Sequence, residues 1–222
     1  MDKNVFDKEY YLPYIDQTDK RYIKRKKEYL REYKRMKNYI PNNGKLLDIG
    51  CGTGDFVNVF GENWLKFGKE VSDYAISIAK ENGINFNIDK EDEGTFDLVI
   101  LRGSIHYFED QDYILNYSRK MLKTNGILMI LATPNAGSIY YRIFHDLPML
   151  EKDKQHFLLT DKMLIEKLKN HKFDILKVNK PYFRTSYTNI FKDLLYFILR
   201  LLKFNVASAF YGNMIECVAR KG

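Results

Sequence analysis

The stretch LLDIGCGTGDF, residues 46–56, holds the side chains best suited to bind a small ligand. Three glycines follow an apolar run, and a loop of this kind after a strand commonly cradles a nucleotide. Its spacing differs from the G-x-G-x-x-G of dinucleotide sites, because Gly54 comes one position early and Asp55 follows it. Asp55 and Asp48 would both repel a pyrophosphate. The loop therefore favours a ligand with a cationic portion and no phosphate.

A further carboxylate, Glu70, lies at the end of the next expected strand. At this position an acidic side chain can accept hydrogen bonds from both hydroxyls of a ribose. Together with the glycine loop, Glu70 predicts a ligand that has a ribose, a positive centre and no phosphate. S-adenosylmethionine has all three properties.

Four blocks of sequence, in order, resemble class I S-adenosylmethionine-dependent methyltransferases. LLDIGCGTGDF is similar to their first motif, and GKEVSDYAISIAKENG to their second-strand acid and the helix after it. FDLVILRGSIHYFED resembles their fourth strand and its loop, and KMLKTNGILMILATPN their fifth-strand region, with LKTNG in place of the usual LKPGG. The resemblance covers about residues 44–135 and continues more weakly to the end. It implies an enzyme that transfers a methyl group from this cofactor.

The resemblance also implies which residues hold the cofactor. The three glycines would let the backbone approach its methionyl part, Asp48 would support the loop and orient water or the amino group, and Glu70 would bind the ribose. Asp89 would meet the adenine amino group, although an ordinary solvated loop is the alternative there. The full set of expected cofactor-binding residues is Asp48, Gly50, Cys51, Gly52, Gly54, Glu70, Val71, Asp89, Arg102, Tyr11 and Tyr14.

Tyr10, Tyr11 and Tyr14 form an aromatic cluster in an N-terminal arm of 18 residues that we expect to be irregular. In related enzymes such arms fold over the cofactor as a lid, and simple docking of the arm onto the core is the alternative. Of the two cysteines, Cys51 is expected to be chemically inert. With Cys217 it makes neither a disulfide framework nor a zinc motif, so no metal is expected.

Three histidines are the candidates for catalysis. His106 lies in the loop over the expected sulfonium site and is the first candidate for a general base or an acceptor ligand. A histidine bonded to nearby backbone is the alternative. His145 and His156 lie in the insert 135–158, which in this fold usually covers the acceptor. The loop sequence LRGSIHYF lacks the Asn-Pro-Pro-Tyr motif typical of enzymes that methylate planar nitrogens, which favours an oxygen acceptor.

Further segments resemble a branch of these enzymes common in bacterial surface-polysaccharide gene clusters: ATPNAGSIYYRIF, KQHFLLTD and KDLLYFILRLL. This implies O-methylation of a small polar or phosphorylated acceptor, such as a sugar or sugar nucleotide in surface-glycan biosynthesis. The alternatives are an RNA methyltransferase and a catalytically idle scaffold that binds a partner or a membrane through 190–211.

The elements that must position these residues form one α/β domain. Short apolar segments alternate with helical ones, which is typical of a Rossmann-like, mostly parallel sheet with helices on both faces. The parts are an arm and basic helix (1–40), a cofactor-binding core (44–134) and substrate-side inserts (135–158 and 181–211). We expect helices near 19–40, 55–61, 74–82, 111–122 and 160–170, with Asp73 and Thr160 as caps. Seven strands are expected, the last antiparallel: 45–50, 65–71, 84–88, 96–101, 126–132, 172–180 and 213–221.

The net charge of +7 is concentrated in one helix, since residues 20–37 hold ten Lys or Arg and two Glu. A solvated helix face is the simplest interpretation, and an anionic partner is the alternative. Nucleic acid is not the expected partner of the chain as a whole. The N-terminus has no signal-peptide pattern and no apolar run is long enough to span a bilayer, so we expect a cytoplasmic protein.

The apolar run 194–202, LLYFILRLL, is interrupted by Arg200 and followed by Lys203. Burial against the domain or against the partner in a homodimer is the simplest interpretation. Peripheral contact with a membrane is the alternative.

Overall fold

The computed structural model describes residues 6–151 and 154–222, whose strands form one sheet in the order β2-β1-β3-β4-β6-β5. Strands β1 to β4 pair in parallel, and β6 pairs antiparallel with both of its neighbours. This confirms the α/β class and the antiparallel last strand. The strands are β1 (Gly44–Ile49), β2 (Trp64–Lys69), β3 (Phe96–Arg102), β4 (Leu122–Pro134), β5 (Phe173–Asn179) and β6 (Met214–Lys221).

The prediction of a seventh strand at 84–88 is wrong. This segment makes only an isolated bridge, in which Asn85 pairs with Phe67 of β2. The side chain of Asn85 then accepts a hydrogen bond from the backbone amide of Asn87, at 2.9 Å, and a 3-10 turn at Ile88–Lys90 follows. These local hydrogen bonds turn the backbone away from β2 before a ladder can form.

Seven α-helices occur in the described residues. The expectations for two segments are corrected: the N-terminal arm is not irregular but contains a helix capped by Asp7, and residues 55–61 form only a 3-10 turn at Val57–Val59. Ser72 rather than Asp73 caps α3, while the Thr160 cap of α6 is confirmed. The helices are α1 (Lys8–Ile15), α2 (Lys20–Met36), α3 (Asp73–Glu81), α4 (Gln111–Met121), α5 (Ile139–Phe144), α6 (Asp161–Asn170) and α7 (Ile190–Leu201).

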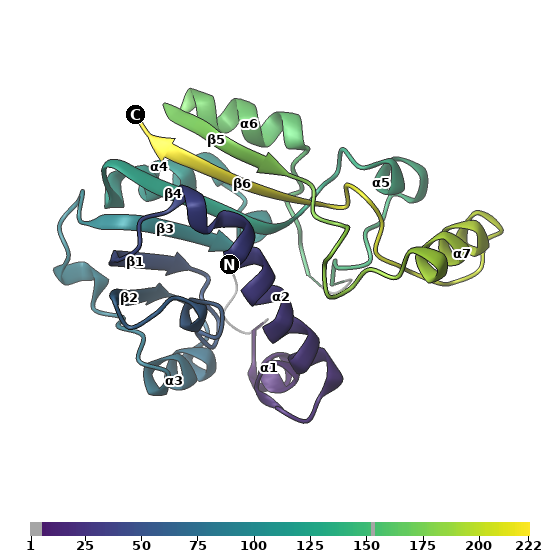
Figure 1. Ribbon diagram of the computed structural model, residues 1–222, viewed down its shortest axis with the longest axis horizontal. Coiled ribbons are helices and arrows are strands. Elements are labelled where there is room, and N and C mark those ends of the chain that lie inside the picture. The colour runs from purple at the N-terminus through teal and green to yellow at the C-terminus, as the bar shows by residue number, and fades with distance from the viewer. Residues whose placement is uncertain (1–5, 152–153) are drawn as a thin grey trace.

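Helices cover both faces of the sheet, as the apolar strands predict (Figure 1). Successive residues of a strand point to opposite faces. Leu47 therefore packs in one core cluster with residues of α4 and α6, while its neighbour Leu46 packs in a second cluster with residues of α2 and α3. Burial on both faces fixes the register of the strands, and with it the edge at which their carboxyl ends meet.

The carboxyl ends of the parallel strands face the side of the molecule where α1 and α2 lie (Figure 1). Helix α7 projects from the body of the protein at the same end of the sheet. None of the helices in the described residues is both long and apolar enough to cross a bilayer.

Candidate functional site

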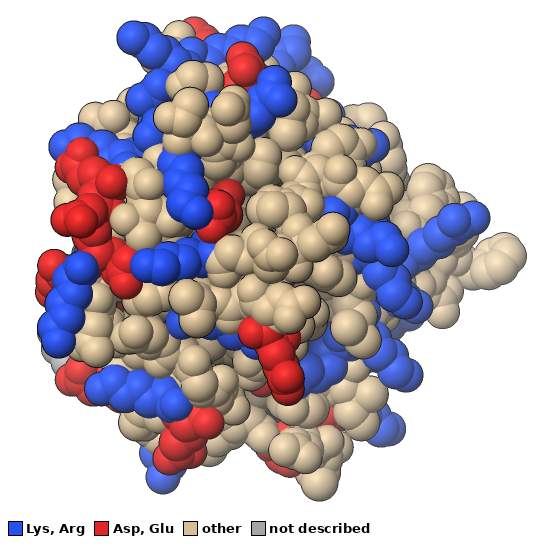
Figure 2. All heavy atoms as spheres, turned by 60° about the vertical axis from the view of Figure 1, so that its left-hand side comes forward, with Lys and Arg blue, Asp and Glu red and all other residues tan. Residues whose placement is uncertain are grey.

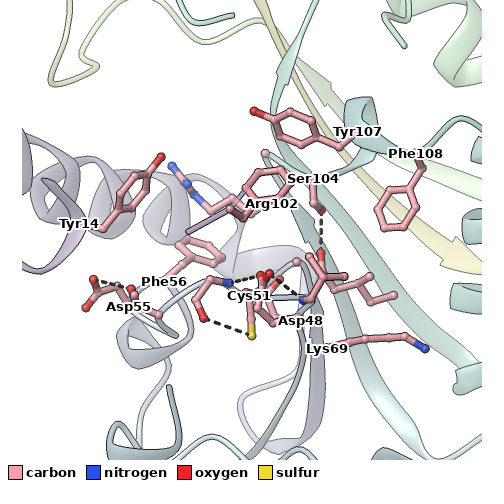
Figure 3. A pocket seen from close by; sticks show the side chains of 18 of the residues that line it. Tyr14, Asp48, Cys51, Asp55, Phe56, Lys69, Arg102, Ser104, Tyr107 and Phe108 are labelled. Atoms are coloured by element: carbon pink, nitrogen blue, oxygen red, sulfur yellow. Dashed lines mark hydrogen bonds between the residues drawn. The ribbon is translucent and has the colours of Figure 1, made fainter. Parts of the chain in front are cut away.

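A cavity of about 280 Å³ lies at the carboxyl ends of β1, β2 and β3, between the sheet and α1. Figure 3 shows Tyr14 on one side of it and Phe108 on the other, with Asp48 and Cys51 along the loop between them. Nine of the eleven residues expected to bind the cofactor line this cavity: Asp48, Gly50, Cys51, Gly52, Glu70, Val71, Arg102, Tyr11 and Tyr14. Gly54 and Asp89 do not.

The glycine loop has a left-handed backbone at each of its three glycines, with φ of 79°, 54° and 78° at Gly50, Gly52 and Gly54. A Cβ at Gly50 would lie 2.6 Å from the Cβ of Ser104, and one at Gly54 would lie 2.8 Å from Ile84. At Gly52 the nearest atom would be in the ring of Tyr11, at 3.4 Å. Gly50 and Gly54 are therefore needed for packing, whereas Gly52 forms the bare floor of the cavity.

The amides of this loop are already used within the protein. Gly50 donates to the carbonyl of Lys69 at 2.7 Å, and Gly54 donates to the carbonyl of Cys51 at 3.0 Å. Gly52 donates to Glu70 Oε2 at 2.9 Å. Since a 3-10 turn rather than an α-helix follows, no helix N-terminus faces the cavity here. The geometry agrees with a loop that does not cradle a phosphate.

Asp48 places a carboxylate against the cavity with 1% of its surface exposed. Its Oδ1 has no hydrogen-bond partner among the described residues. Burial raises the pKa of Asp48 to about 7, and the nearby Glu70 charge adds to this, while Arg102 opposes it. A buried carboxylate with a free oxygen fits a cationic ligand group, because such a group would supply the missing partner.

Glu70 is held at the end of β2 by three backbone amides. Its Oε2 accepts from Gly52, and its Oε1 accepts from Val71 at 2.8 Å and from Ser72 at 3.1 Å. Tyr11 covers this carboxylate: burial raises the pKa of Tyr11, and the charge of Glu70 raises it further. The carboxylate is thus fixed in place beside the cavity, as a ribose ligand requires.

The N-terminal arm docks on the core and forms one wall of the cavity. The ring of Phe6 packs edge-on against Tyr107, with centroids 5.4 Å apart. Lys154 lies 3.3 Å from the ring centroid of Tyr10, and its neighbour Glu151 accepts a 3.2 Å hydrogen bond from Tyr107. Lys154 and Glu151 therefore contact two residues of the cavity wall, Tyr10 and Tyr107, from outside the lining. The arm is thus docked on the core, and its role as a lid over the cofactor stays a prediction.

The family is decided by the match of the chain to known proteins. Residues 21–178 match the model of a family described as a methyltransferase domain. The chain belongs to this family. Its cofactor is S-adenosylmethionine and its product S-adenosylhomocysteine. The orphaned oxygen of Asp48 and the bare floor at Gly52 fit that cofactor.

Relatives and solved structures agree with this. The methyltransferase is 26% identical over 196 residues to a ubiquinone/menaquinone biosynthesis C-methyltransferase of Campylobacter jejuni. The alignment covers 72% of this chain and 83% of that protein. A structure of a Pyrococcus horikoshii protein has a TM-score of 0.65 at 18% identity and covers 97% of this chain and 99% of that one. A Thermotoga maritima S-adenosylmethionine-dependent methyltransferase has a TM-score of 0.64 at 16% identity, with coverage of 96% and 98%. At these identities the structural likeness shows the fold.

Arg102 lines the cavity of the methyltransferase, but its guanidinium is already bound by residues of α2. Its Nε and Nη2 donate to the two oxygens of Glu32, at 2.6 and 3.0 Å, and its guanidinium lies 4.3 Å from the ring centroid of Tyr29. Glu32 was not foreseen as a site residue. Its signal in the sequence is an acid on the apolar face of an otherwise basic helix, four residues after Glu28.

The three histidines proposed for catalysis are not among the residues that line the cavity. His106 is buried, and its ring stacks on His156 with centroids 5.6 Å apart. Burial, with His156 adding to it, lowers the pKa of His106 to about 3, so this imidazole is neutral. His145 is exposed at the end of α5. The expected position of His106 over the sulfonium site is therefore wrong. The acceptor roles of His145 and His156 stay predictions.

The expected position of Asp89 at the adenine is also wrong, because Asp89 is exposed in the 3-10 turn Ile88–Lys90. The missing strand at 84–88 explains this, because the residue after a paired strand would reach the carboxyl edge.

One wall of the methyltransferase cavity was not predicted from the sequence. Its signal is the apolar and aromatic spacing after β3, in Tyr107, Phe108, Tyr113, Ile114 and Tyr117.

Proposed function

We propose that this methyltransferase acts on an oxygen of a small polar acceptor, such as a phosphorylated sugar or a sugar nucleotide in surface-glycan biosynthesis. The observation that carries the proposal is the narrowing of the cavity by the N-terminal arm. Helix α1 lies on one side, and Lys154 and Glu151 of the insert bind to Tyr10 and Tyr107 above it. A site narrowed in this way suits a small acceptor better than a long polymer.

A cation near the cavity supports an anionic group on the acceptor. The guanidinium of Arg25 lies 3.6 Å from the ring centroid of Tyr14, which lines the cavity. Its Nη1 donates to the carbonyl of Pro13, and no carboxylate among the described residues pairs with it. Arg102, in contrast, is neutralised by Glu32. Arg25 is therefore a candidate partner of a phosphate or carboxylate on the acceptor, as is Lys69 of the lining, which pairs with no carboxylate among the described residues.

The chemistry needs alignment more than it needs a catalytic side chain. The cofactor supplies a methyl group on a sulfonium, and the chain's own residues hold the reactants in line and exclude water. No histidine lines the cavity in the described residues, and burial raises the pKa of Tyr10, Tyr11 and Tyr107, so that these phenols stay protonated. A hydroxyl acceptor would then lose its proton to water, to its own phosphate or to a carboxylate of the lining such as Asp48.

The test is to incubate the purified chain with methyl-labelled cofactor and a panel of acceptors. The panel contains sugar nucleotides, sugar phosphates, an unphosphorylated sugar and a quinone precursor. Transfer of label to the phosphorylated acceptors, together with an added methyl on oxygen in the mass spectrum, would support the proposal. Arg25→Gln should raise KM for these acceptors with little change in cofactor affinity. Label on the quinone precursor alone would overturn the choice of acceptor and leave the methyltransferase assignment intact.

C-methylation of an aromatic ring is the second candidate. It is favoured by the C-methyltransferase relative and by the many aromatic side chains around the cavity. The RNA alternative is less well supported, because Lys26, Arg31 and Arg35 on the basic helix already pair with Asp55 or Glu28.

A further inference from the structure

The outer face of α7 is apolar and exposed. Phe191 has 89% of its surface exposed, the largest value among the exposed apolar residues of the described chain. The exposed positions recur at intervals of four, three and four residues, which places them in one stripe along the helix. Members of this stripe are Ile190, Phe191, Leu194, Leu195, Ile198, Leu201 and Leu202. The expected burial of this run against the domain is wrong for this face.

The opposite face of α7 holds the helix to the protein. Phe197 stacks on Phe210, with centroids 4.6 Å apart, and packs against Phe144 of α5. Arg200, which interrupts the apolar run in the sequence, points to this side as well, where it donates to Asp146 at 2.7 Å and to Tyr140. Because Arg200 faces inward, the exposed stripe contains no charge.

The charges around the stripe are of one sign. Residues 181–212 contain four cations, Arg184, Lys192, Arg200 and Lys203, and one acid, Asp193. Asp193 is buried with 3% of its surface exposed and accepts hydrogen bonds from Tyr182 and from the backbone of Asn189, both at 3.0 Å. On the face that Figure 2 shows, the projection at the right is tan and blue without red atoms.

Lys192 lies in the first turn of α7, and Lys203 lies in the left-handed turn just after the C-terminal cap of the helix, with φ of 67°. Both side chains are exposed, so a cation stands near each end of the stripe. Long cationic side chains in such positions can reach phosphate groups while the apolar residues beside them enter the acyl region. The helix has 12 residues, too few to span a bilayer, so it would lie in the plane of the surface.

We propose that α7 docks this protein on an anionic lipid surface, with its apolar stripe inserted and Lys192 and Lys203 at the headgroups. A second copy of the chain is the less suitable occupant, since it would bring the same cations together with no exposed acid from 181–212 to pair with them. The segment before α7 is tied to α2: Ser186 donates its amide to Glu28 at 2.6 Å, and Arg31 donates to Ser186 Oγ at 2.8 Å. This proposal goes beyond the proposed acceptor and does not depend on it.

The experiment is sedimentation of the full chain with sucrose-loaded vesicles of phosphatidylcholine, with and without phosphatidylglycerol. The chain should bind the anionic vesicles and bind the neutral ones several-fold more weakly. The variant Phe191→Ser/Leu195→Ser/Ile198→Ser should lose at least about tenfold in vesicle affinity. Leu65→Ser is the matched control, because Leu65 is an equally exposed apolar residue on β2, with 60% of its surface exposed, and it should bind like the parent chain.

A second pair of variants separates α7 from the basic helix. Lys192→Gln/Lys203→Gln should weaken binding to anionic vesicles, and Lys24→Gln/Lys27→Gln on α2 should change it less. Cofactor binding, measured on every variant, confirms that each is folded. Equal binding by the triple variant and the parent chain would overturn the proposal. The proposal would also be overturned if the parent chain does not bind vesicles and forms a dimer, while the triple variant is a monomer.

Discussion

At the scale of single residues, Asp48 ties cofactor binding to pH. Burial raises its pKa to about 7, so the free protein holds this carboxyl protonated below that pH. A cationic cofactor group binds the ionised form, and binding therefore releases a proton below about pH 7. We expect the affinity for S-adenosylhomocysteine, measured by calorimetry, to rise by up to about tenfold per pH unit and to level off above about pH 7. Asp48→Asn should flatten the profile; a parent profile as flat as that of the variant would contradict this role.

The same burial predicts that Asp48 lowers the stability of the protein without ligand. The unfolded chain ionises this group near pH 4, whereas the folded chain keeps it protonated to about pH 7. Between these values the folded state binds the extra proton, so the free energy of unfolding falls as pH rises and is constant above. Asp48→Asn should therefore raise the free energy of unfolding at pH 8 by roughly 1–3 kcal/mol in urea titrations. An equal gain at pH 4 would rule out ionisation as the cause.

Gly52 offers a sharper test of the floor of the cavity. Its φ of 54° disfavours any side chain, and a Cβ would point toward Tyr11 in the cavity rather than into the core. Gly52→Ala should weaken cofactor affinity by at least about tenfold, with a loss of stability of about 1–2 kcal/mol. Gly61→Ala is the control, since a Cβ there meets no atom within 4 Å. Similar affinities of the two variants would show that the bare floor does not matter.

The sequence predicts best those residues whose role depends on backbone and charge. Gly50, Asp48 and Glu70 lie where their spacing from the strands places them, because a paired strand fixes the direction of each residue near its end. His106 was predicted wrongly because the 3-10 turn Ile105–Tyr107 determines which side chain faces the cavity. That turn puts Tyr107 into the lining instead, and the sequence alone does not show which of the neighbours His106 and Tyr107 faces the cavity.

At the scale of elements, α2 is held to the sheet by buried ion pairs. Glu32 has 3% of its surface exposed and binds Arg102 of β3 through both oxygens, while Arg35 pairs with Glu28 and with Glu216 of β6. Burial raises the pKa of Glu32, an effect that Arg102 opposes. Glu32→Ala leaves the guanidinium buried without its counter-ion, and we expect the free energy of unfolding to fall by about 3–5 kcal/mol.

The matched control for this prediction is Lys34→Ala, an exposed position on the same helix that should change stability by less than about 0.5 kcal/mol. Urea denaturation of both variants is the measurement. If Glu32→Ala costs no more than Lys34→Ala, the buried pair contributes nothing to docking of the helix.

Elements with strong periodicity were predicted well, and short ones were not. The buried strands and α4 carry patterns that only one structure satisfies, and the Thr160 cap marks the start of α6. The arm was predicted as irregular, although Asp7 caps a helix there, because Pro13 and clustered tyrosines obscure any apolar stripe. Tertiary contacts with Tyr107 and Lys154 stabilise that short helix. Such contacts cannot be read from a local pattern.

At the scale of the whole molecule, segments distant in the sequence form the walls of one cavity: the arm, the glycine loop, the end of β2 and the residues from Arg102 to Tyr117. The cofactor should therefore stabilise the fold as a unit. At a free concentration about 100-fold above its Kd, it should add about 2.7 kcal/mol to the free energy of unfolding. For a chain of this length that corresponds to a rise in Tm of roughly 5–10 °C.

Scanning calorimetry with and without S-adenosylhomocysteine measures this rise in Tm. Glu70→Ala should show a smaller rise at the same concentration, because the loss of the ribose ligand raises Kd. A rise confined to one of two separate transitions would show instead that the arm or an insert unfolds independently of the core that holds the cofactor.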